Sequence, residues 1–205
     1  MSNQITRVIR PSIHQLQPGD LLMIYSNDHN IYIIIQGVII INKLFSNNER
    51  FSSDLVCTGH IIQDIFQQGK YYNYCYELTP IVNTYIISIP STSKNLYKSI
   101  ITAYHTRTKQ QSSEVNLLSI WIHKSIRNRI IHLLLLLCEV TGRSYQHSLV
   151  LDVQLSYKLI ATITGSTRNT ASRIIRQLEN DYIIEYTKKQ IRISNIFLLN
   201  KYAIL

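Results

Sequence analysis

The chain has 205 residues, of which 45% are hydrophobic and 16% charged, and its formal net charge is +9. This apolar share excludes wholesale disorder, and the length allows one or two domains with a buried core. The longest uncharged stretch, 78–93, contains Pro80 and Pro90 and does not fit a membrane span, and no secretory signal opens the sequence. The three scattered cysteines exclude a disulfide framework and a paired-cysteine metal site, and they predict reduced thiols inside a cell.

Positive charge is concentrated toward the C-terminal end. Residues 1–120 hold 9 Lys and Arg against 7 Asp and Glu, a net of +2, whereas residues 121–205 hold 12 against 5, a net of +7. This asymmetry indicates a nearly neutral module followed by one that meets a polyanion. The 14 Tyr against 6 Gly, with many Ile and few Ala, indicate AT-rich codons and hence the genome of a plastid or a reduced bacterium.

The first 90 residues, which hold all four prolines, have the pattern of a β-protein. Short runs rich in Ile, Val and Tyr alternate there with turn residues. We expect strands at Leu21–Tyr25, Ile31–Gln36, Val38–Leu44, Leu55–Cys57, Tyr72–Leu78 and Thr84–Ile89. Many short strands separated by turns are typical of a sandwich or roll.

A long helix is predicted over 93–121, because residues of one face return there at helical spacing. That face comprises Leu96, Ile100, Tyr104, Gln111, Val115, Leu118 and Ile122. A helix with such a stripe would not stay exposed, so we expect it to pack on the roll, on a second copy of itself, or on both. An ordinary connecting helix is the alternative. A second helix is predicted near Ser125–Val140, with Gly142 as its C-cap.

Residues 155–186 have the pattern of a helix-turn-helix. Ser156 can cap a short helix that ends at Gly165, a residue that adopts positive φ at low cost in a sharp turn. We expect Ser166 to cap a second helix over Thr167–Glu179. Its predicted buried face holds Ala171, Ile174, Ile175 and Leu178, at i, i+3, i+4 and i+7.

The outer face of this second helix is polar and basic, as in a recognition helix that enters the major groove of DNA. Arginine can bind guanine in a bidentate manner, asparagine can read adenine, and hydroxyl groups near the helix N-terminus can hold phosphate. A predicted hairpin of Tyr182–Tyr186 and Gln190–Ser194, with Leu149–Val153 as a third strand, forms a wing with a basic tip. The predicted DNA-binding residues are Ser166, Thr167, Arg168, Asn169, Thr170, Ser172, Arg173, Arg176, Lys188 and Lys189.

Residues 153–194 resemble the winged helix-turn-helix of the Crp/Fnr transcription regulators, and in particular the NtcA-like nitrogen regulators of cyanobacteria and plastids. The likeness is carried by the run from Ile163 to Arg173 and by the helix Arg129–Cys138, and more loosely by Pro18-Gly19-Asp20 and Leu78-Thr79-Pro80. In the family, residues that match Arg168 and Arg173 read bases in a palindromic site, and position 169 helps to discriminate.

The resemblance implies an α+β fold in three parts. These are a cyclic-nucleotide-binding-like β-roll as sensor over 1–93, a dimerisation helix over 94–122 and a DNA-binding domain over 123–205. It further implies double-stranded DNA, a second copy of the chain and RNA polymerase as partners, a role as an activator, no membrane, and a plastid or chloroplast location.

The sensor departs from both ligand patterns of the family. Residues 61–72 lack the Gly-Glu and Arg-Ala pairs that hold the phosphate of cAMP, so cAMP is not expected. The NtcA-like members bind 2-oxoglutarate through three charged positions. Here the corresponding positions hold Tyr71, with Lys70 beside it, and Lys109 and Glu114, five residues apart. Lysines can bind a dicarboxylate without the arginine fork, so 2-oxoglutarate is the expected effector and a sensor that no longer binds it is the alternative.

Other classes of protein are less consistent with the sequence. The seven histidines show no metal-binding grouping, and no nucleophile motif or phosphate loop is present, so we expect no catalytic residue, no metal and no resident cofactor. A haem- or redox-sensing relative, with His60 or Cys75 as haem ligand, is a second alternative. A scaffold protein that binds no DNA is a third alternative, and it would not explain the basic outer face of the second helix.

Overall fold

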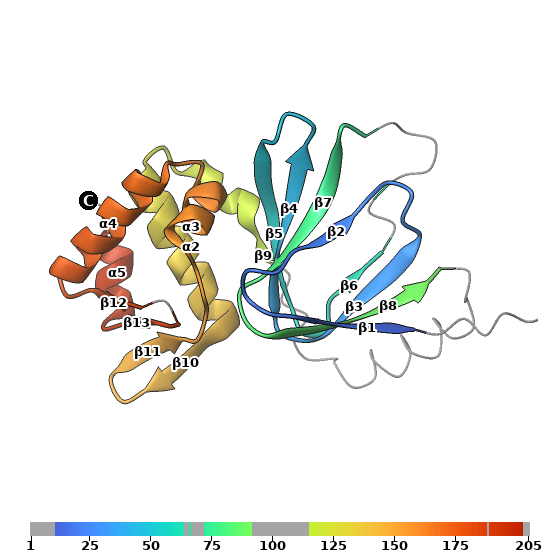
Figure 1. The fold of residues 1–205 in the computed structure, drawn as a ribbon. Coiled ribbons are helices and arrows are strands. Elements are labelled where there is room, and N and C mark those ends of the chain that lie inside the picture. The colour runs from blue at the N-terminus through green and yellow to red at the C-terminus, as the bar shows by residue number, and fades with distance from the viewer. Residues whose placement is uncertain (1–10, 64–65, 67–71, 92–114, 188, 203–205) are drawn as a thin grey trace, which may run out of the picture.

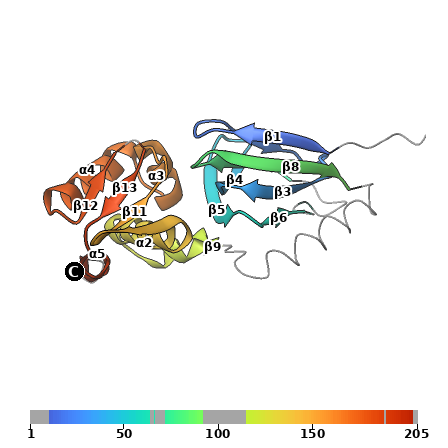
Figure 2. The same ribbon diagram turned by 90° about the horizontal axis from the view of Figure 1, so that it is seen from below.

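The computed structural model describes residues 11–63, 66, 72–91, 115–187 and 189–202. The N-terminal half is a roll of two facing antiparallel sheets, with strand orders β1-β8-β3-β6 and β2-β7-β4-β5-β9 (Figures 1 and 2). Its strands are β1 (Ser12–Leu16), β2 (Leu22–Ile24), β3 (Asn30–Gln36), β4 (Val38–Phe45), β5 (Arg50–Cys57), β6 (Ile61–Ile62), β7 (Tyr74–Pro80), β8 (Thr84–Pro90) and β9 (Val115–Asn116). The six strands predicted from sequence are confirmed, whereas β1, β6 and β9 were not predicted.

Side chains of β4 alternate between two hydrophobic cores, as the pleat of a strand requires. Ile39 and Ile41 pack inside the roll with residues of β3, β7 and β8. Val38 and Ile40 point to the other face of the sheet and join a second core that extends into the C-terminal half. One strand therefore borders both the interior of the roll and the packing between the two halves of the chain.

The segment that leads out of the roll differs from the helix predicted over 93–121. Residues 92–114 lie outside the described part. Val115 pairs with Leu55 at the edge of β5, so this end of the segment is a strand. A 3₁₀-helix, η1 (Leu117–Ile122), follows it, with Leu117 and Ile120 buried, and the Asn116 side chain accepts a hydrogen bond from Leu118 N at its start. The α-helical prediction is wrong over 115–122, because pairing with β5 and a three-residue spacing of buried side chains determine the local structure. The division of the chain at 93/94 and 122/123 stays a prediction.

In its described residues, the C-terminal half consists of four α-helices and a four-stranded antiparallel sheet of order β10-β11-β13-β12. Its α-helices are α2 (Ile126–Thr141), α3 (Tyr157–Thr164), α4 (Arg168–Asn180) and α5 (Ile196–Tyr202), and η1 packs against α2 and α3. The strands are β10 (Gly142–Tyr145), β11 (Ser148–Leu151), β12 (Ile184–Tyr186) and β13 (Ile191–Ile193). The predicted second helix is confirmed as α2. Gly142 is its C-cap as predicted, but its φ of −66° is not left-handed, and the chain continues directly into the unpredicted β10.

The two halves share a buried core. Ile40 and Leu55 of the roll and Ile81, in the turn between β7 and β8, lie in one cluster with the buried side chains of α2, α3 and α4. The main chain adds a hydrogen bond of 2.7 Å from Gln154 N to Ile81 O. As a result the C-terminal half lies against the β5–β9 edge of the roll (Figure 1). Within the described residues, no helix combines the length and apolar character needed to span a membrane.

Candidate nucleic-acid interface

The first helix of the motif, α3, begins and ends at residues that the sequence identifies. The Ser156 hydroxyl accepts a hydrogen bond of 3.1 Å from Leu159 N, which satisfies one free N–H of the first turn. Ile160 and Ile163 are buried. The helix ends at Gly165, which has a φ of 63° and ψ of 44° and donates its N–H to Ala161 O. This left-handed residue turns the chain sharply toward the next helix, as predicted.

The second helix, α4, has Thr167 as its N-cap, so the prediction of Ser166 is wrong by one residue. The Thr167 hydroxyl accepts from Thr170 N at 3.2 Å and lies 2.9 Å from the Thr170 hydroxyl. Ser166 is held inside the turn instead: its N–H donates to Ala161 O, and its hydroxyl lies 3.1 Å from that of Thr164. Ser166 therefore belongs to the turn, while Thr167 and Thr170 stand at the start of α4.

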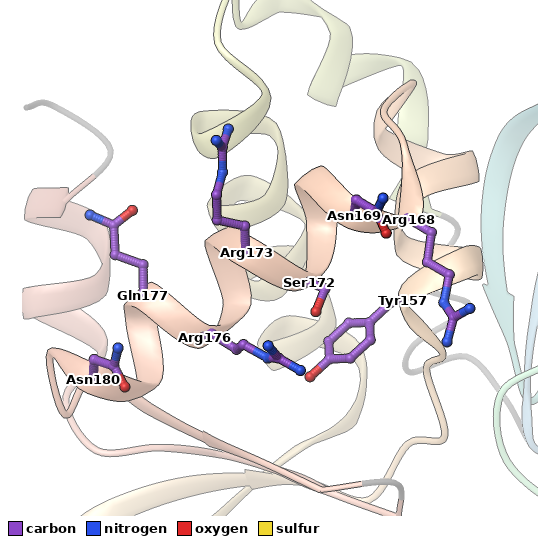
Figure 3. A pocket seen from close by; sticks show the side chains of 8 residues that line it. All are labelled: Tyr157, Arg168, Asn169, Ser172, Arg173, Arg176, Gln177 and Asn180. Atoms are coloured by element: carbon purple, nitrogen blue, oxygen red, sulfur yellow. The ribbon is translucent and has the colours of Figure 1, made fainter.

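The inner and outer faces of α4 are separated as the spacing predicts. The buried face consists of Ala171, Ile174, Ile175 and Leu178. The outer face lines a shallow depression of about 730 Å³, whose lining consists of Tyr157 of α3 and, from α4, Arg168, Asn169, Ser172, Arg173, Arg176, Gln177 and Asn180 (Figure 3). In the described part of the chain, its three arginines have neither an ion-pair nor a hydrogen-bond partner among the side chains. Three uncompensated positive charges on an exposed helix face suit a polyanion.

The three arginines of this face point in different directions (Figure 3). Arg173 points away from the helix on one side, and Arg176 points toward the Tyr157 ring on the other. Arg168 points away from both and also lines a cleft of about 760 Å³ that lies mainly between α3 and the roll. The cleft brings Arg168 together with Lys158, Arg50 and the buried Glu77, whose carboxylate is paired with Arg50 at 3.1 Å. Arg168 thus lies between the outer face of α4 and the roll.

Tyr157, Gln177 and Asn180 were not predicted as part of this face. Gln177 follows Arg173 by four residues, and Asn180 follows Arg176 by four, so helical spacing alone could have added both. Tyr157 lies on α3, and no local pattern relates it to α4. Its ring stacks on Tyr186 with centroids 5.0 Å apart.

The wing is present and anchored to the motif. β12 and β13 pair antiparallel, and β11 adds the predicted third strand on the other side of β13. Burial, with Tyr157 and Glu179 adding to it, raises the pKa of Tyr186 to about 12, so its hydroxyl stays protonated and donates to Leu155 O. Thr187 N donates to Gln190 O at 2.9 Å and closes the tip, where Lys189 is exposed. Lys188 lies outside the described residues.

The predicted effector residues Lys70, Tyr71, Lys109 and Glu114 all lie outside the described residues. Of the two suggested haem ligands, Cys75 is half-buried on β7, and its thiol donates to Leu44 O at 3.8 Å. No group of three or more His, Cys, Asp or Glu in the described ranges is placed to hold a metal ion.

Comparisons with known proteins agree with this geometry. Residues 128–202 match the Crp-like helix-turn-helix domain. The chain is 29% identical over 199 residues to the putative HTH-type transcriptional regulator ycf28 of Porphyra purpurea, and the match covers 92% of this chain and 81% of the relative. It is 22% identical to the global nitrogen regulator of Synechococcus elongatus, covering 80% and 77%.

Solved structures show the same fold. A CRP-family transcriptional regulator from Thermus thermophilus superposes with a TM-score of 0.67 at 15% identity, covering 94% of this chain and 97% of that one. FixK2 from Bradyrhizobium japonicum has a TM-score of 0.64 at 16% identity, with the same coverage of 94% and 97%. The described part of the chain thus has the β-roll and the Crp-like helix-turn-helix of these structures. The chain carries a Crp-like helix-turn-helix domain over residues 128–202, and it resembles the Crp/Fnr transcription regulators, with global nitrogen regulators among its relatives.

Proposed function

We propose that this chain binds a palindromic DNA site as a homodimer and controls transcription in response to nitrogen status. The observation that carries the proposal is the outer face of α4, where Asn169 and Arg173 are exposed and Ser172 is half-buried, opposite a fully apolar inner face. Amide and guanidinium groups on a short exposed helix can read base edges, which a purely electrostatic surface does not require.

A palindrome reader needs two recognition helices about 34 Å apart, and hence a dimer. The described end of the proposed dimerisation segment supports this. Leu118 is 46% exposed and Ile122 is 81% exposed. Large apolar side chains that continue the stripe predicted for 94–122 are suited to a self-complementary contact with a second copy.

The regulatory part of the proposal rests on the relatives. Global nitrogen regulators are among these relatives. The resemblance of the sequence to the NtcA-like regulators suggests 2-oxoglutarate as the effector and RNA polymerase as a partner. We assign Lys70, Tyr71, Lys109 and Glu114 to the effector site and propose activation as the mode of action. The AT-rich composition and the ycf28 relative support a plastid location. A constitutive DNA binder whose sensor has lost its ligand is the second candidate, favoured by the absence of arginine from 61–72.

The test is selection of duplexes from a randomised pool by the wild-type protein, followed by measurement of affinity for the selected duplex and for random DNA. Arg173→Ala should cost ~1–3 kcal/mol on the selected duplex and relax base preference, because it removes a contact to a base edge. Lys189→Ala is the matched control. It should weaken both duplexes alike and reduce the salt slope by about one, because it removes a contact to phosphate. Failure to enrich any sequence, or equal losses for both variants on both duplexes, would contradict the proposal.

A further inference from the structure

Trp121, the only tryptophan of the chain, lies where the roll, η1 and the helix-turn-helix meet. Its indole lies directly against Gly165: a Cβ placed on that glycine would be 2.8 Å from Cζ3 of the ring. On the roll side, the Phe51 ring of β5 lies 6.1 Å away, centroid to centroid. One side chain therefore contacts both a strand of the sensor and the turn from which the recognition helix begins.

Arg129 fixes the indole in this place. Its guanidinium carbon lies 4.6 Å from the centre of the Trp121 ring, a cation–π distance. Its Nε donates to His123 O at 2.9 Å, and its Nη1 donates to Thr164 O at 3.2 Å. Thr164 is fully buried and ends α3, so its carbonyl is one that the helix itself leaves without a partner, and a cation there is favourable. The arginine thus ties the indole, the residue that follows η1 and the end of α3 together.

The turn at Gly165 has no side chain of its own with which to set the angle between α3 and α4. The indole takes that place, since the far edge of the ring fills the space where a Cβ would stand. A shift of β5 would move Phe51 and the ring together, and the ring cannot move toward the turn without moving the backbone of Gly165. Trp121 is 37% exposed, so part of the side chain faces solvent while the rest lies against Gly165, Phe51 and Arg129.

We propose that Trp121 is a positioning residue that carries the position of β5 through Phe51 to the turn before α4, and so sets how the recognition helix is presented to DNA. The proposal rests on the sequence-specific binding proposed above. It concerns the ratio of operator affinity to random-DNA affinity, because phosphate contacts tolerate small rotations of α4 whereas base contacts do not.

The experiment uses the full-length chain, the duplex selected in vitro by the wild type, and a random duplex. Trp121→Ala should lower the affinity ratio by about 5-fold to 150-fold, the range typical of coupled sites. Trp121→Phe keeps a ring beneath Arg129 but cannot reach Gly165. It should lower the ratio in the same direction while the thermal midpoint stays close to that of the wild type, an outcome that a merely structural role would not produce. Tyr145→Ala is the matched control, because Tyr145 also lies beneath an arginine, with Arg192 5.9 Å from its ring centre, but away from the turn; its ratio should not change.

A third variant tests the connection to the roll. Phe51→Leu should shift the emission of the single tryptophan and lower the ratio, and its effect should not add to that of Trp121→Phe, because both act through one contact. A wild type that does not discriminate between the two duplexes would refute the proposed function itself. If the wild type discriminates but Trp121→Phe and Trp121→Ala keep the full ratio, the positioning role is wrong. If Phe51→Leu alone changes neither emission nor ratio, the roll does not act through Trp121.

Discussion

Replacing Gly165 by alanine places a Cβ where the structure opposes it on two independent grounds. The residue has a φ of 63°, and the left-handed conformation costs an L-residue with a side chain ~1–2 kcal/mol. The new Cβ would also lie 2.8 Å from Cζ3 of Trp121 and closer still to Cη2, so the indole or the turn has to move. Forced overpacking of this kind costs ~1–3 kcal/mol. Alanine also reduces the conformational entropy of the unfolded chain, which stabilises the folded state by ~0.4–1 kcal/mol.

The net expectation for Gly165→Ala is a loss of about 1–4.5 kcal/mol in the free energy of unfolding, a substantial part of the ~5–15 kcal/mol typical of a domain. Urea unfolding followed by the helical circular dichroism signal measures it. The two contributions can be separated by a double-mutant cycle. In a Trp121→Ala background the overpacking disappears and only the backbone cost remains. The loss of unfolding free energy caused by Gly165→Ala should therefore be smaller in that background than in the wild type, by at least ~1 kcal/mol.

Two results would refute this reasoning. A Gly165→Ala variant within ~0.5 kcal/mol of the wild type would mean that the turn does not need a left-handed residue. An equal loss in both backgrounds would mean that Trp121 does not occupy the space next to the turn. The affinity of the variant for DNA is a separate measurement, since a turn that opens without unfolding changes the presentation of α4 alone.

Leu118→Lys should convert the dimer to a monomer and abolish palindrome binding, because it places a charge on the exposed apolar stripe; sedimentation that shows only a 23.9 kDa species for the wild type would exclude the dimer. Millimolar 2-oxoglutarate should tighten operator binding several-fold, and Lys109→Ala should remove this response; no heat on titration and a flat operator affinity would favour the constitutive binder. Burial lowers the pKa of His132 below its ordinary 6.5; the charge of His123 adds to this effect and that of Glu139 opposes it. As the pH falls, His132 therefore becomes protonated in the unfolded chain at a higher pH than in the folded chain. The free energy of unfolding should therefore hold above about pH 6.5 and fall as the pH drops below it, and His132→Gln should remove this part of the pH dependence of the urea midpoint.

The motif could be predicted almost completely from sequence, because its determinants are local. Ser156 caps, Gly165 turns, and the apolar positions of α4 repeat at helical spacing within one segment. The same holds for the six predicted strands, which are bounded by turn residues. The error of one residue at the N-cap of α4 arises because Ser166 and Thr167 are both capping residues, and only the hydrogen bond from Ser166 N to Ala161 O assigns Ser166 to the turn.

What the sequence did not reveal depends on contacts between distant segments. Val115 has helical spacing with its predecessors, but its pairing with Leu55 makes it a strand. The place of Tyr157 beside Arg176 results from how α3 crosses α4, and Arg168 meets residues of the roll only across a cleft. The contact between Trp121 and Gly165 joins residues 44 positions apart, and no periodicity in either segment indicates it.

The packing of β4 limits how the sensor can influence α4. Ile39 and Ile41 face the interior of the roll, while Val38 and Ile40 face the core shared with α3 and α4, so a displacement of this strand changes both cores at once. Close-packed cores adopt discrete arrangements and do not deform continuously, and a ligand shifts their balance only by its difference in affinity for each. A ligand in the roll that shifts β4 slightly would therefore also change the packing around the turn between α3 and α4. If the sensor binds no ligand, the same shared core holds α4 in one position and operator affinity is constant, so the response to 2-oxoglutarate distinguishes the two proposed modes without any change in the DNA-binding surface.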